Sequence, residues 1–231
     1  MSINGGAFFM PLSQRFTALF SAKNQSLALQ CFDVLTEHYS ESHRHYHTLH
    51  HITACLDQLD SLLLDTQHEE DTAYLSDHYR DLALALWFHD VIYDPTRQDN
   101  EAQSAQFAQR WLRQLNEPNS IVSAVNDYIL ATAHTAQHTV DNTVINTYAA
   151  DVLLDIDLSI LGAPAAQFQH YEAAIRQEYH FVLAPQYRQG RIDVLTHFLA
   201  QPTIFRSNIY RSLYEQQARI NLIAAINTLR R

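Results

Sequence analysis

The segment LALALWFHDVIYD, Leu82–Asp94, decides how this chain is interpreted, because it places a His-Asp pair at the end of a long apolar run. The residues three and four positions from His89 are all apolar or aromatic: Ala85, Leu86, Ile92 and Tyr93. This spacing predicts a helix that continues to Tyr93 and buries His89. A carboxylate buried beside it, at Asp90, needs a cation, hydrogen-bond donors or a metal ion as its partner.

The composition around this segment favours an all-α protein. The 231 residues include only 4 Gly and 6 Pro, and 47% are hydrophobic. Apolar residues recur at helical spacing, which predicts a bundle of roughly ten helices in a single domain, residues 1–231. The predicted helices lie within residues 16–20, 26–40, 46–65, 74–93, 99–115, 120–138, 147–162, 164–183, 190–201 and 207–230. Their expected boundaries are Asp94-Pro95, an N-cap at Asp99 or Asn100, and Gly162-Ala163-Pro164.

The net charge and the N-terminus limit the classes of partner. A formal net charge of −10 disfavours binding to a nucleic acid duplex, although one pocket could still take a small anion. No segment is long and apolar enough to span a membrane, and the N-terminus has no signal-peptide pattern. Cys31 and Cys55 lie in apolar helical patterns, so we expect two buried, reduced thiols and a cytoplasmic protein.

Residues with metal-ligand chemistry occur at four places. The chain contains 14 His, which is high for its length. Two pairs, His47 with His51 and His134 with His138, have the i, i+4 spacing that shares one helix face. The other two places are His89-Asp90 and the segment DIDL, with Asp155 and Asp157.

The two aspartates of DIDL face different surroundings on a helix. The i±3 and i±4 neighbours of Asp157 are all apolar, whereas those of Asp155 include Asp151 and Ser159. We therefore expect Asp157 to be the buried carboxylate and Asp155 to be solvated. Two His and two Asp from separate helices would neutralise a divalent ion and leave positions open for water. The sequence thus offers a cation as the partner of Asp90.

In this order the motifs resemble the HD superfamily of metal-dependent phosphohydrolases, and more narrowly an uncharacterised bacterial branch of it. The resemblance covers about residues 44–222. It rests on RxYHxxxHI (Arg44–Ile52), WFHDxxYD (Trp87–Asp94), NExxSA (Asn100–Ala105), TAH (Thr132–His134), DxDLxILG (Asp155–Gly162), IRxEY (Ile175–Tyr179), GRxxVLxxFL (Gly190–Leu199) and ARxNL (Ala218–Leu222).

The resemblance implies an HD-like bundle with a core at about residues 44–162, against which helices at 164–231 pack. It also implies that one divalent metal ion (Mg, Mn, Co, Ni, Zn or Fe) is held by His47, His89, Asp90 and Asp157. The superfamily usually has Arg three residues after its first His, but this chain has His50 there. His51 therefore competes with His47 as the first ligand, and His138 and Asp155 are further alternates.

The implied activity is hydrolysis of a phosphate ester on a small substrate such as a nucleotide. Arg44 would clamp the phosphate or form a surface ion pair. His134 would stabilise the developing charge, or be a polar helix-end residue. Some HD nucleotidases have a catalytic Glu where this chain has Tyr93, so Asp94 or Glu101 becomes the candidate acid or base. Glu101 also suits the first turn of a helix.

Two other functions fit the same pattern. Extra His ligands could build a two-iron site, as in HD-type oxygenases. A closed site with four ligands would instead indicate a non-catalytic module that binds a metal or a nucleotide. Four residues near the C-terminus are expected to serve helix packing and ion pairs: Tyr187, Arg188, Arg191 and Arg219.

Overall fold

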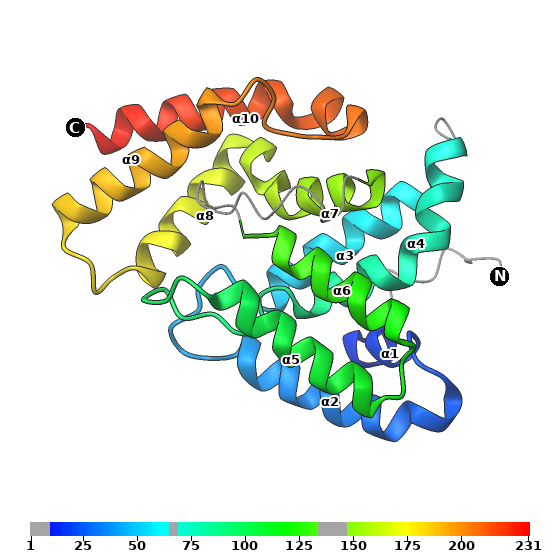
Figure 1. The fold of residues 1–231 in the computed structure, drawn as a ribbon. Coiled ribbons are helices and arrows are strands. Elements are labelled where there is room, and N and C mark those ends of the chain that lie inside the picture. The colour runs from blue at the N-terminus through cyan, green and yellow to red at the C-terminus, as the bar shows by residue number, and fades with distance from the viewer. Residues whose placement is uncertain (1–9, 65–68, 134–146) are drawn as a thin grey trace. The chain divides into compact units, whose positions relative to one another are not determined.

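The computed structural model describes residues 10–64, 69–133 and 147–231. Within these ranges the chain forms ten α-helices and two short 3-10 helices, with no strand (Figure 1). The all-α prediction is confirmed. The chain divides into two compact units, residues 1–150 and 151–231. The expectation of one domain, with the C-terminal helices packed on a core, stays a prediction.

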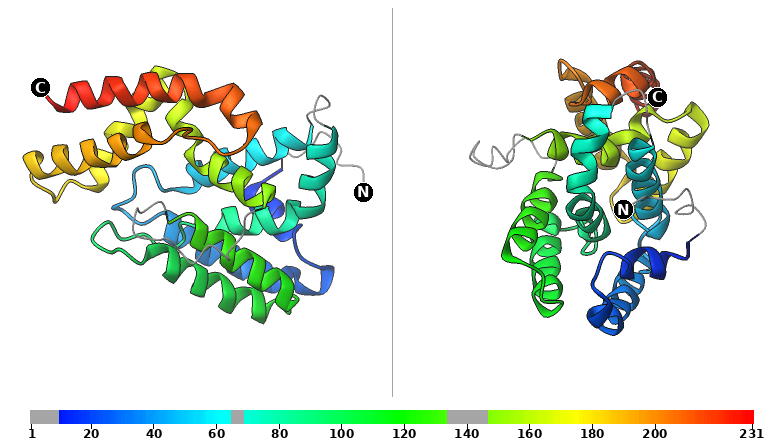
Figure 2. Two further views of the ribbon diagram at one scale, coloured as in Figure 1. Left: turned by 45° about the horizontal axis from the view of Figure 1, so that its top comes forward. Right: turned by 90° about the vertical axis from the view of Figure 1, so that its right-hand side faces the viewer.

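The first unit contains six helices and the start of a seventh. Their bounds are α1 Leu12–Thr17, η2 Ala22–Asn24, α2 Gln25–Tyr39, α3 Leu49–Leu63, α4 Glu69–Phe88, α5 Asn100–Gln114 and α6 Asn119–Ala131. Helix α7, Tyr148–Leu158, crosses the boundary between the units. Helices α3 and α6 both pack against α4, and α5 lies beside α6 in all the views of Figures 1 and 2.

The C-terminal half of α4 is the centre of the first unit. All seven residues from Leu82 to Phe88 are at most 1% exposed. A helix that is apolar on every side must be surrounded by protein, which explains the unbroken apolar run in the sequence. Phe16 of α1 packs edge-on against Trp87, with 5.3 Å between the ring centroids. The helix therefore carries the residues that follow it, His89 and Asp90, into the interior.

Helix α4 ends at Phe88, so the prediction that it continues to Tyr93 is wrong. The cause is a set of donors from another part of the chain. The Tyr39 hydroxyl donates to the carbonyl of Trp87 at 2.9 Å, and the Arg44 guanidinium donates to the carbonyls of Asp90 and Val91. These bonds satisfy one carbonyl in the last turn of the helix and two in the turn that follows it, so the chain can turn while still buried.

Helix α3 begins at Leu49, three residues later than predicted. Thr48 is its N-cap, and the Thr48 hydroxyl accepts a hydrogen bond from the backbone N–H of His50 at 3.3 Å. A Thr at this position favours a helix start. His47 therefore precedes the helix, and the expectation that His47 and His51 share one helix face is wrong.

The second unit consists of most of α7 followed by η3 Ser159–Gly162, α8 Ala165–Glu178, α9 Ala184–Ala200 and α10 Asn208–Leu229. The predicted break at residues 162–164 is confirmed. The Asn221 amide of α10 donates to the carbonyls of Leu161 and Ala163, both at 2.8 Å, and so fixes this break against α10. Helices α9 and α10 lie side by side in Figures 1 and 2.

Three other sequence predictions concern the cysteines, ion pairs near the C-terminus and membrane spans. Cys31 and Cys55 are buried and form no disulfide within the described residues, as expected. The predicted ion pairs form between Arg191 and Glu172 at 2.5 Å and between Arg219 and Glu215 at 2.7 Å. None of the helices in the described ranges combines the length and the apolar character that crossing a membrane requires.

Candidate metal centre

Three side chains of the first unit converge at the buried end of α4. His51 lies on the first turn of α3, and His89 and Asp90 lie in the turn that directly follows α4. His89 is 1% exposed and His51 is 5% exposed. The side chain of Asp90 is 19% exposed, so this carboxylate is the ligand that faces the solvent.

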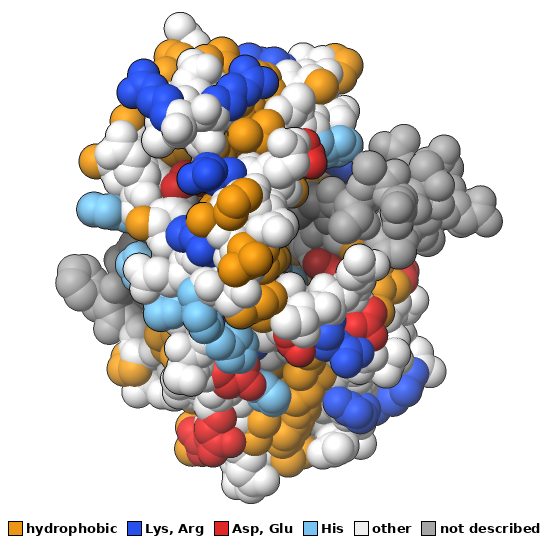
Figure 3. Space-filling model, turned by 90° about the vertical axis from the view of Figure 1, so that its left-hand side faces the viewer, with side chains coloured by type: hydrophobic (Ala, Val, Ile, Leu, Met, Phe, Trp, Pro, Cys, Tyr) orange, Lys and Arg blue, Asp and Glu red, His pale blue; other side chains and the backbone are white. Residues whose placement is uncertain are grey.

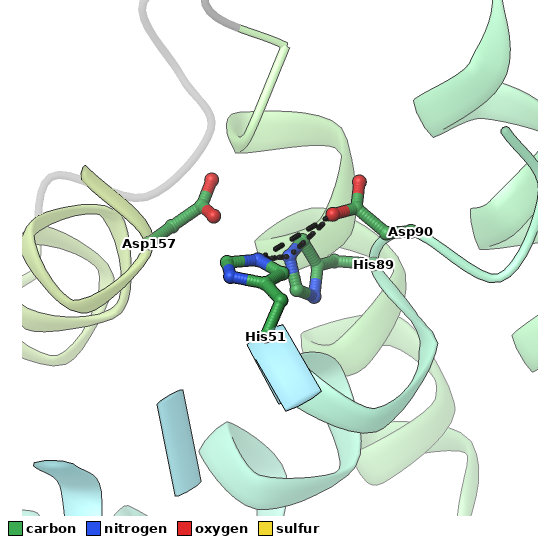
Figure 4. Close-up of side chains that lie close together, drawn as sticks. All are labelled: His51, His89, Asp90 and Asp157. Carbon is green, nitrogen blue, oxygen red and sulfur yellow. Dashed lines mark hydrogen bonds and ion pairs between the residues drawn. The ribbon is translucent and has the colours of Figure 1, made fainter. Parts of the chain in front are cut away.

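The nitrogen and oxygen atoms of these residues form a small triangle (Figure 4). The Nε2 atoms of His51 and His89 are 3.2 Å apart. Asp90 Oδ2 lies 3.1 Å from His89 Nε2 and 3.5 Å from His51 Nε2. With metal–ligand bonds of about 2.0–2.2 Å, neighbouring ligand atoms around one ion lie roughly 2.8–3.6 Å apart. The three atoms therefore have the spacing of ligands that share one metal ion.

The hydrogen bond on the other side of the His89 ring fixes its ligand atom. His89 Nδ1 donates to the carbonyl of Leu86 at 2.9 Å. In the neutral imidazole this leaves Nε2 without a proton, with its lone pair directed at the triangle. A bond of this kind is typical of histidines that bind metals. His51 Nδ1 has the Sγ atom of Cys55 at 3.7 Å.

Arg44 holds the turn that carries Asp90. Its side chain has no exposed surface. Besides Asp90 and Val91, its donors reach the carbonyl of His47 at 3.1 Å and the carboxylate of Glu41 at 3.0 Å. The guanidinium also lies over the ring of Tyr93, 5.5 Å from its centroid. Arg44 thus forms an ion pair, with Glu41, as one of the two alternatives from the sequence had it, but its guanidinium is buried and also binds the backbone of the Asp90 turn.

The segment after Asp90 is fixed by residues of the NExxSA motif. The side chain of Asn100 exchanges two hydrogen bonds with the backbone of Asp94, at 2.9 and 3.0 Å. The hydroxyl of Ser104 bonds both the N–H and the carbonyl of Ile92. His43 Nε2 lies 2.8 Å from the carbonyl of Tyr93. Sequence reasoning missed these supporting roles, because nothing in the spacing links residues 92–94 to their partners.

The structure brings His51, and not His47, into the triangle. The His47 ring instead stacks on Tyr93, with 4.1 Å between centroids and 28° between planes. Its backbone carbonyl is one of the acceptors of Arg44. His51 was the alternate first ligand in the sequence analysis, and its place on the first turn of α3 follows from the helix start at Leu49.

The two candidate acids of the first unit lie outside the triangle. Asp94 accepts hydrogen bonds from the N–H and the hydroxyl of Thr96, at 2.9 and 2.7 Å. These bonds, the hydroxyl first, hold the pKa of the Asp94 carboxyl below its usual range. Glu101 is half-buried in the first turn of α5. His134 and His138 lie outside the described residues.

The burial predicted for the two aspartates of α7 is wrong. Asp155 is fully buried, whereas Asp157 is only half-buried. Asp155 accepts hydrogen bonds from the backbone N–H groups of Arg206 and Ser207, both at 2.7 Å. Burial raises the pKa of its carboxyl, and these bonds oppose the shift. Asp157 belongs to the second unit, and its membership of the metal centre stays a prediction.

The fold and this triangle define an all-α protein with a candidate metal centre. The chain matches no model of a protein family, no curated protein and no solved structure. The geometry of the residues described above and the motifs of the sequence are therefore the features that indicate a function.

Proposed function

We propose that this chain is a metal-dependent phosphohydrolase that cleaves a phosphate ester of a small substrate such as a nucleotide. The observation that carries the proposal is the convergence of His51, His89 and Asp90 at separations of 3.1–3.5 Å. Two imidazoles and a carboxylate suit a divalent transition metal or a catalytic zinc ion better than they suit a structural zinc site, which usually contains thiolates.

We propose Asp157 as the fourth ligand. Asp90 with two neutral imidazoles supplies one negative charge, so a divalent ion at the triangle keeps a positive charge. A second carboxylate would neutralise it, and Asp157 occupies the matching position of the DxDLxILG motif. Asp155 is a poor alternate because both of its carboxylate oxygens already accept backbone hydrogen bonds.

A divalent ion in such a site supplies Lewis acidity and lowers the pKa of a bound water. The protein's own residues have separate tasks. Asp90, the most exposed of the three ligands, marks the side from which a phosphate can approach. Arg44 acts as a positioning residue that holds the Asp90 turn, in place of the phosphate clamp expected from the sequence.

Ester hydrolysis breaks a P–O bond, and the departing oxygen takes up a proton. The lowered pKa of Asp94 makes that carboxyl a poor proton donor at neutral pH. We assign the proton donor to Glu101 or His134. Asp94, which stays ionised, is then restricted to orienting a water molecule.

The test combines metal analysis with a substrate panel. Chelator-treated protein is reloaded with Mg²⁺, Mn²⁺, Co²⁺, Ni²⁺, Zn²⁺ or Fe²⁺, and phosphate release is measured from p-nitrophenyl phosphate and a set of nucleotides. We expect one ion per chain and metal-dependent release. Asp90→Asn should lower the rate at least a hundredfold, while Asp193→Asn, an exposed carboxylate on α9, should leave it unchanged.

Three results would overturn the proposal: no release with any of these metals, full activity of Asp90→Asn, or activity that survives chelation. A stoichiometry of two irons per chain with a visible absorption band would indicate the oxygenase instead. Tight binding of one ion without any turnover would indicate the non-catalytic module.

A further inference from the structure

The second unit contains a cavity of about 420 Å³ between α8, α9 and α10. All of its lining residues fall within positions 165–229, so it belongs to this unit alone. Its volume is in the range of pockets that hold small molecules, roughly 300–1,000 Å³. None of its lining residues belongs to the ligand set of the proposed phosphohydrolase.

Small residues create the space in this cavity. Five of its lining residues are alanines: Ala165, Ala173, Ala184, Ala224 and Ala225. The larger apolar members are Phe168, Tyr187 and Leu229. Phe168 is 3% exposed and Tyr187 is 8% exposed, so buried aromatic rings contribute to the wall. A surface of this kind can take an apolar body from water without displacing any large side chain.

The charged residues of the cavity differ in whether an ion pair balances their charge. Glu172 is paired with Arg191, with 2.5 Å between Glu172 Oε1 and an Arg191 terminal nitrogen, so its negative charge is balanced. Arg176 donates to the carbonyls of Tyr179 and Val182, which are neutral partners, and it lies over the ring of Tyr187. The positive charge of Arg176 is therefore not balanced by any carboxylate in the described contacts.

Arg188 is a second cation of the cavity wall, and its guanidinium donors differ from those of Arg176 in their contacts. Its side chain is exposed and lines the cavity, and it takes part in none of the hydrogen bonds or ion pairs found among the described residues. We expected Arg188 to serve helix packing and ion pairing, and it takes part in no ion pair found among the described residues. With Arg176, it makes the cavity positively charged.

The charge of the second unit differs from that of the whole chain. Residues 151–231 contain eight Arg and seven Asp or Glu, whereas the chain has a formal net charge of −10. In the space-filling view of Figure 3, blue Lys or Arg side chains and orange apolar side chains lie next to one another in the upper part of the face shown. An anion thus meets less repulsion at this unit than at the acidic remainder of the chain.

We propose that this cavity binds an amphipathic monocarboxylate, such as a medium-chain fatty acid, with its chain among the alanines and its carboxylate on Arg188. The apolar wall selects the body of the ligand, and the positive charge selects its head. The Arg188 guanidinium forms none of the hydrogen bonds or ion pairs found among the described residues, and one guanidinium fork matches one carboxylate.

The test is calorimetric titration of the metal-free full-length chain with decanoate, kept below its micellar concentration. We expect saturable binding of one decanoate per chain. Decanol has the same apolar chain without the charge and should bind roughly three- to tenfold more weakly. The readout involves neither metal nor phosphate release, so its failure is distinguishable from failure of the phosphohydrolase proposal.

Two variants separate the contributions of charge and of space. Arg188→Gln should weaken decanoate binding roughly three- to tenfold and leave decanol binding unchanged, while Arg113→Gln, an exposed arginine of α5, serves as the matched charge control. Ala173→Trp should abolish binding of both ligands by filling the cavity, and circular dichroism checks that it folds.

Four results would overturn the proposal. They are no saturable decanoate binding, equal affinity for decanoate and decanol, an Arg188→Gln affinity equal to that of the wild type, and self-association that covers the cavity in place of a ligand. Binding to phosphatidylglycerol vesicles without any binding of free decanoate would contradict it as well, because the surface would then be a membrane contact.

Discussion

His51 Nε2 and His89 Nε2 lie 3.2 Å apart although 38 residues separate them in the sequence. Two basic nitrogens at this distance share one proton or one cation between them. His89 uses its other nitrogen to donate to Leu86, so its Nε2 is an acceptor. Asp90 adds a carboxylate oxygen 3.1 Å away. The three atoms therefore have a spacing at which they could hold one metal ion.

The two candidate first ligands can be separated by substitution. We expect His51→Ala to weaken binding of Mn²⁺ at least tenfold, because it removes one of the three converging ligand atoms. His47→Ala should change the affinity less than threefold, since the His47 ring stacks on Tyr93 outside the triangle. Equilibrium dialysis against Mn²⁺ measures both. A larger loss in His47→Ala than in His51→Ala would contradict this ligand set.

Arg44 should affect the metal centre through the backbone that it holds. Arg44→Lys keeps the charge but cannot reach the carbonyls of His47, Asp90 and Val91 together. We expect Mn²⁺ affinity to fall tenfold or more, with a loss of about 2–4 kcal/mol in the free energy of unfolding. Arg113→Lys is the control on an exposed helix. A variant with weakened catalysis but unchanged metal affinity and stability would instead indicate a direct role on the substrate.

The two aspartates of α7 should respond in opposite ways. Asp155→Asn places an amide where two backbone N–H groups require acceptors, so we expect about 1–3 kcal/mol lower stability. Asp157→Asn should leave stability nearly unchanged and weaken Mn²⁺ binding. Urea denaturation of the metal-free variants, followed by dialysis, provides both readouts. Unchanged Mn²⁺ affinity in Asp157→Asn would remove it from the proposed ligand set.

Two glycines of the second unit differ in the space around them, and substituting each by alanine compares a crowded site with an open one. A Cβ atom at Gly162 would lie 2.5 Å from Tyr214 Cβ and 2.8 Å from its carbonyl oxygen. Gly162→Ala should therefore cost about 1–3 kcal/mol, because backbone of α10 would have to move. A Cβ at Gly190, in α9, meets nothing within 4 Å. Gly190→Ala should stabilise by about 0.5–1 kcal/mol, and thermal unfolding should show these opposite signs.

Alkaline pH should destabilise the first unit through Tyr128. Burial raises the pKa of Tyr128 to about 12, and the charge of Asp81 adds to the shift. In the unfolded chain the phenol ionises near 10, so the unfolded state releases its proton first as the pH rises. Stability should fall by about 1–2 kcal/mol between pH 10 and about 12. Tyr128→Phe should remove that part of the pH dependence in urea denaturation, and an unchanged slope would contradict the assignment.

The sequence predicted the features that local periodicity controls. The apolar run before His89 predicted its burial, and the break at residues 162–164 followed from Gly and Pro. The end of α4 could not be predicted in this way, because it depends on donors from Tyr39 and Arg44, more than 40 residues earlier.

The same reason explains the error at α7. The neighbours of Asp155 within its helix are partly polar, which indicated solvent. Its actual partners are backbone N–H groups about 50 residues later, at Arg206 and Ser207. Every residue except proline has a backbone N–H, so donors of this kind cannot be recognised from the residue types in the sequence. By contrast, the Thr48 N-cap was a readable signal that α3 begins after His47, and it would have favoured His51 as the ligand.

Metal binding by wild-type protein and by His89→Ala tests the central claim most directly. Isothermal titration of the chelator-treated chain with Mn²⁺ should give one ion per wild-type chain. His89→Ala should weaken this binding at least a hundredfold while circular dichroism still reports a helical protein. Stoichiometric binding of equal affinity in wild type and His89→Ala, or no binding of any divalent ion by the wild type, would contradict the account.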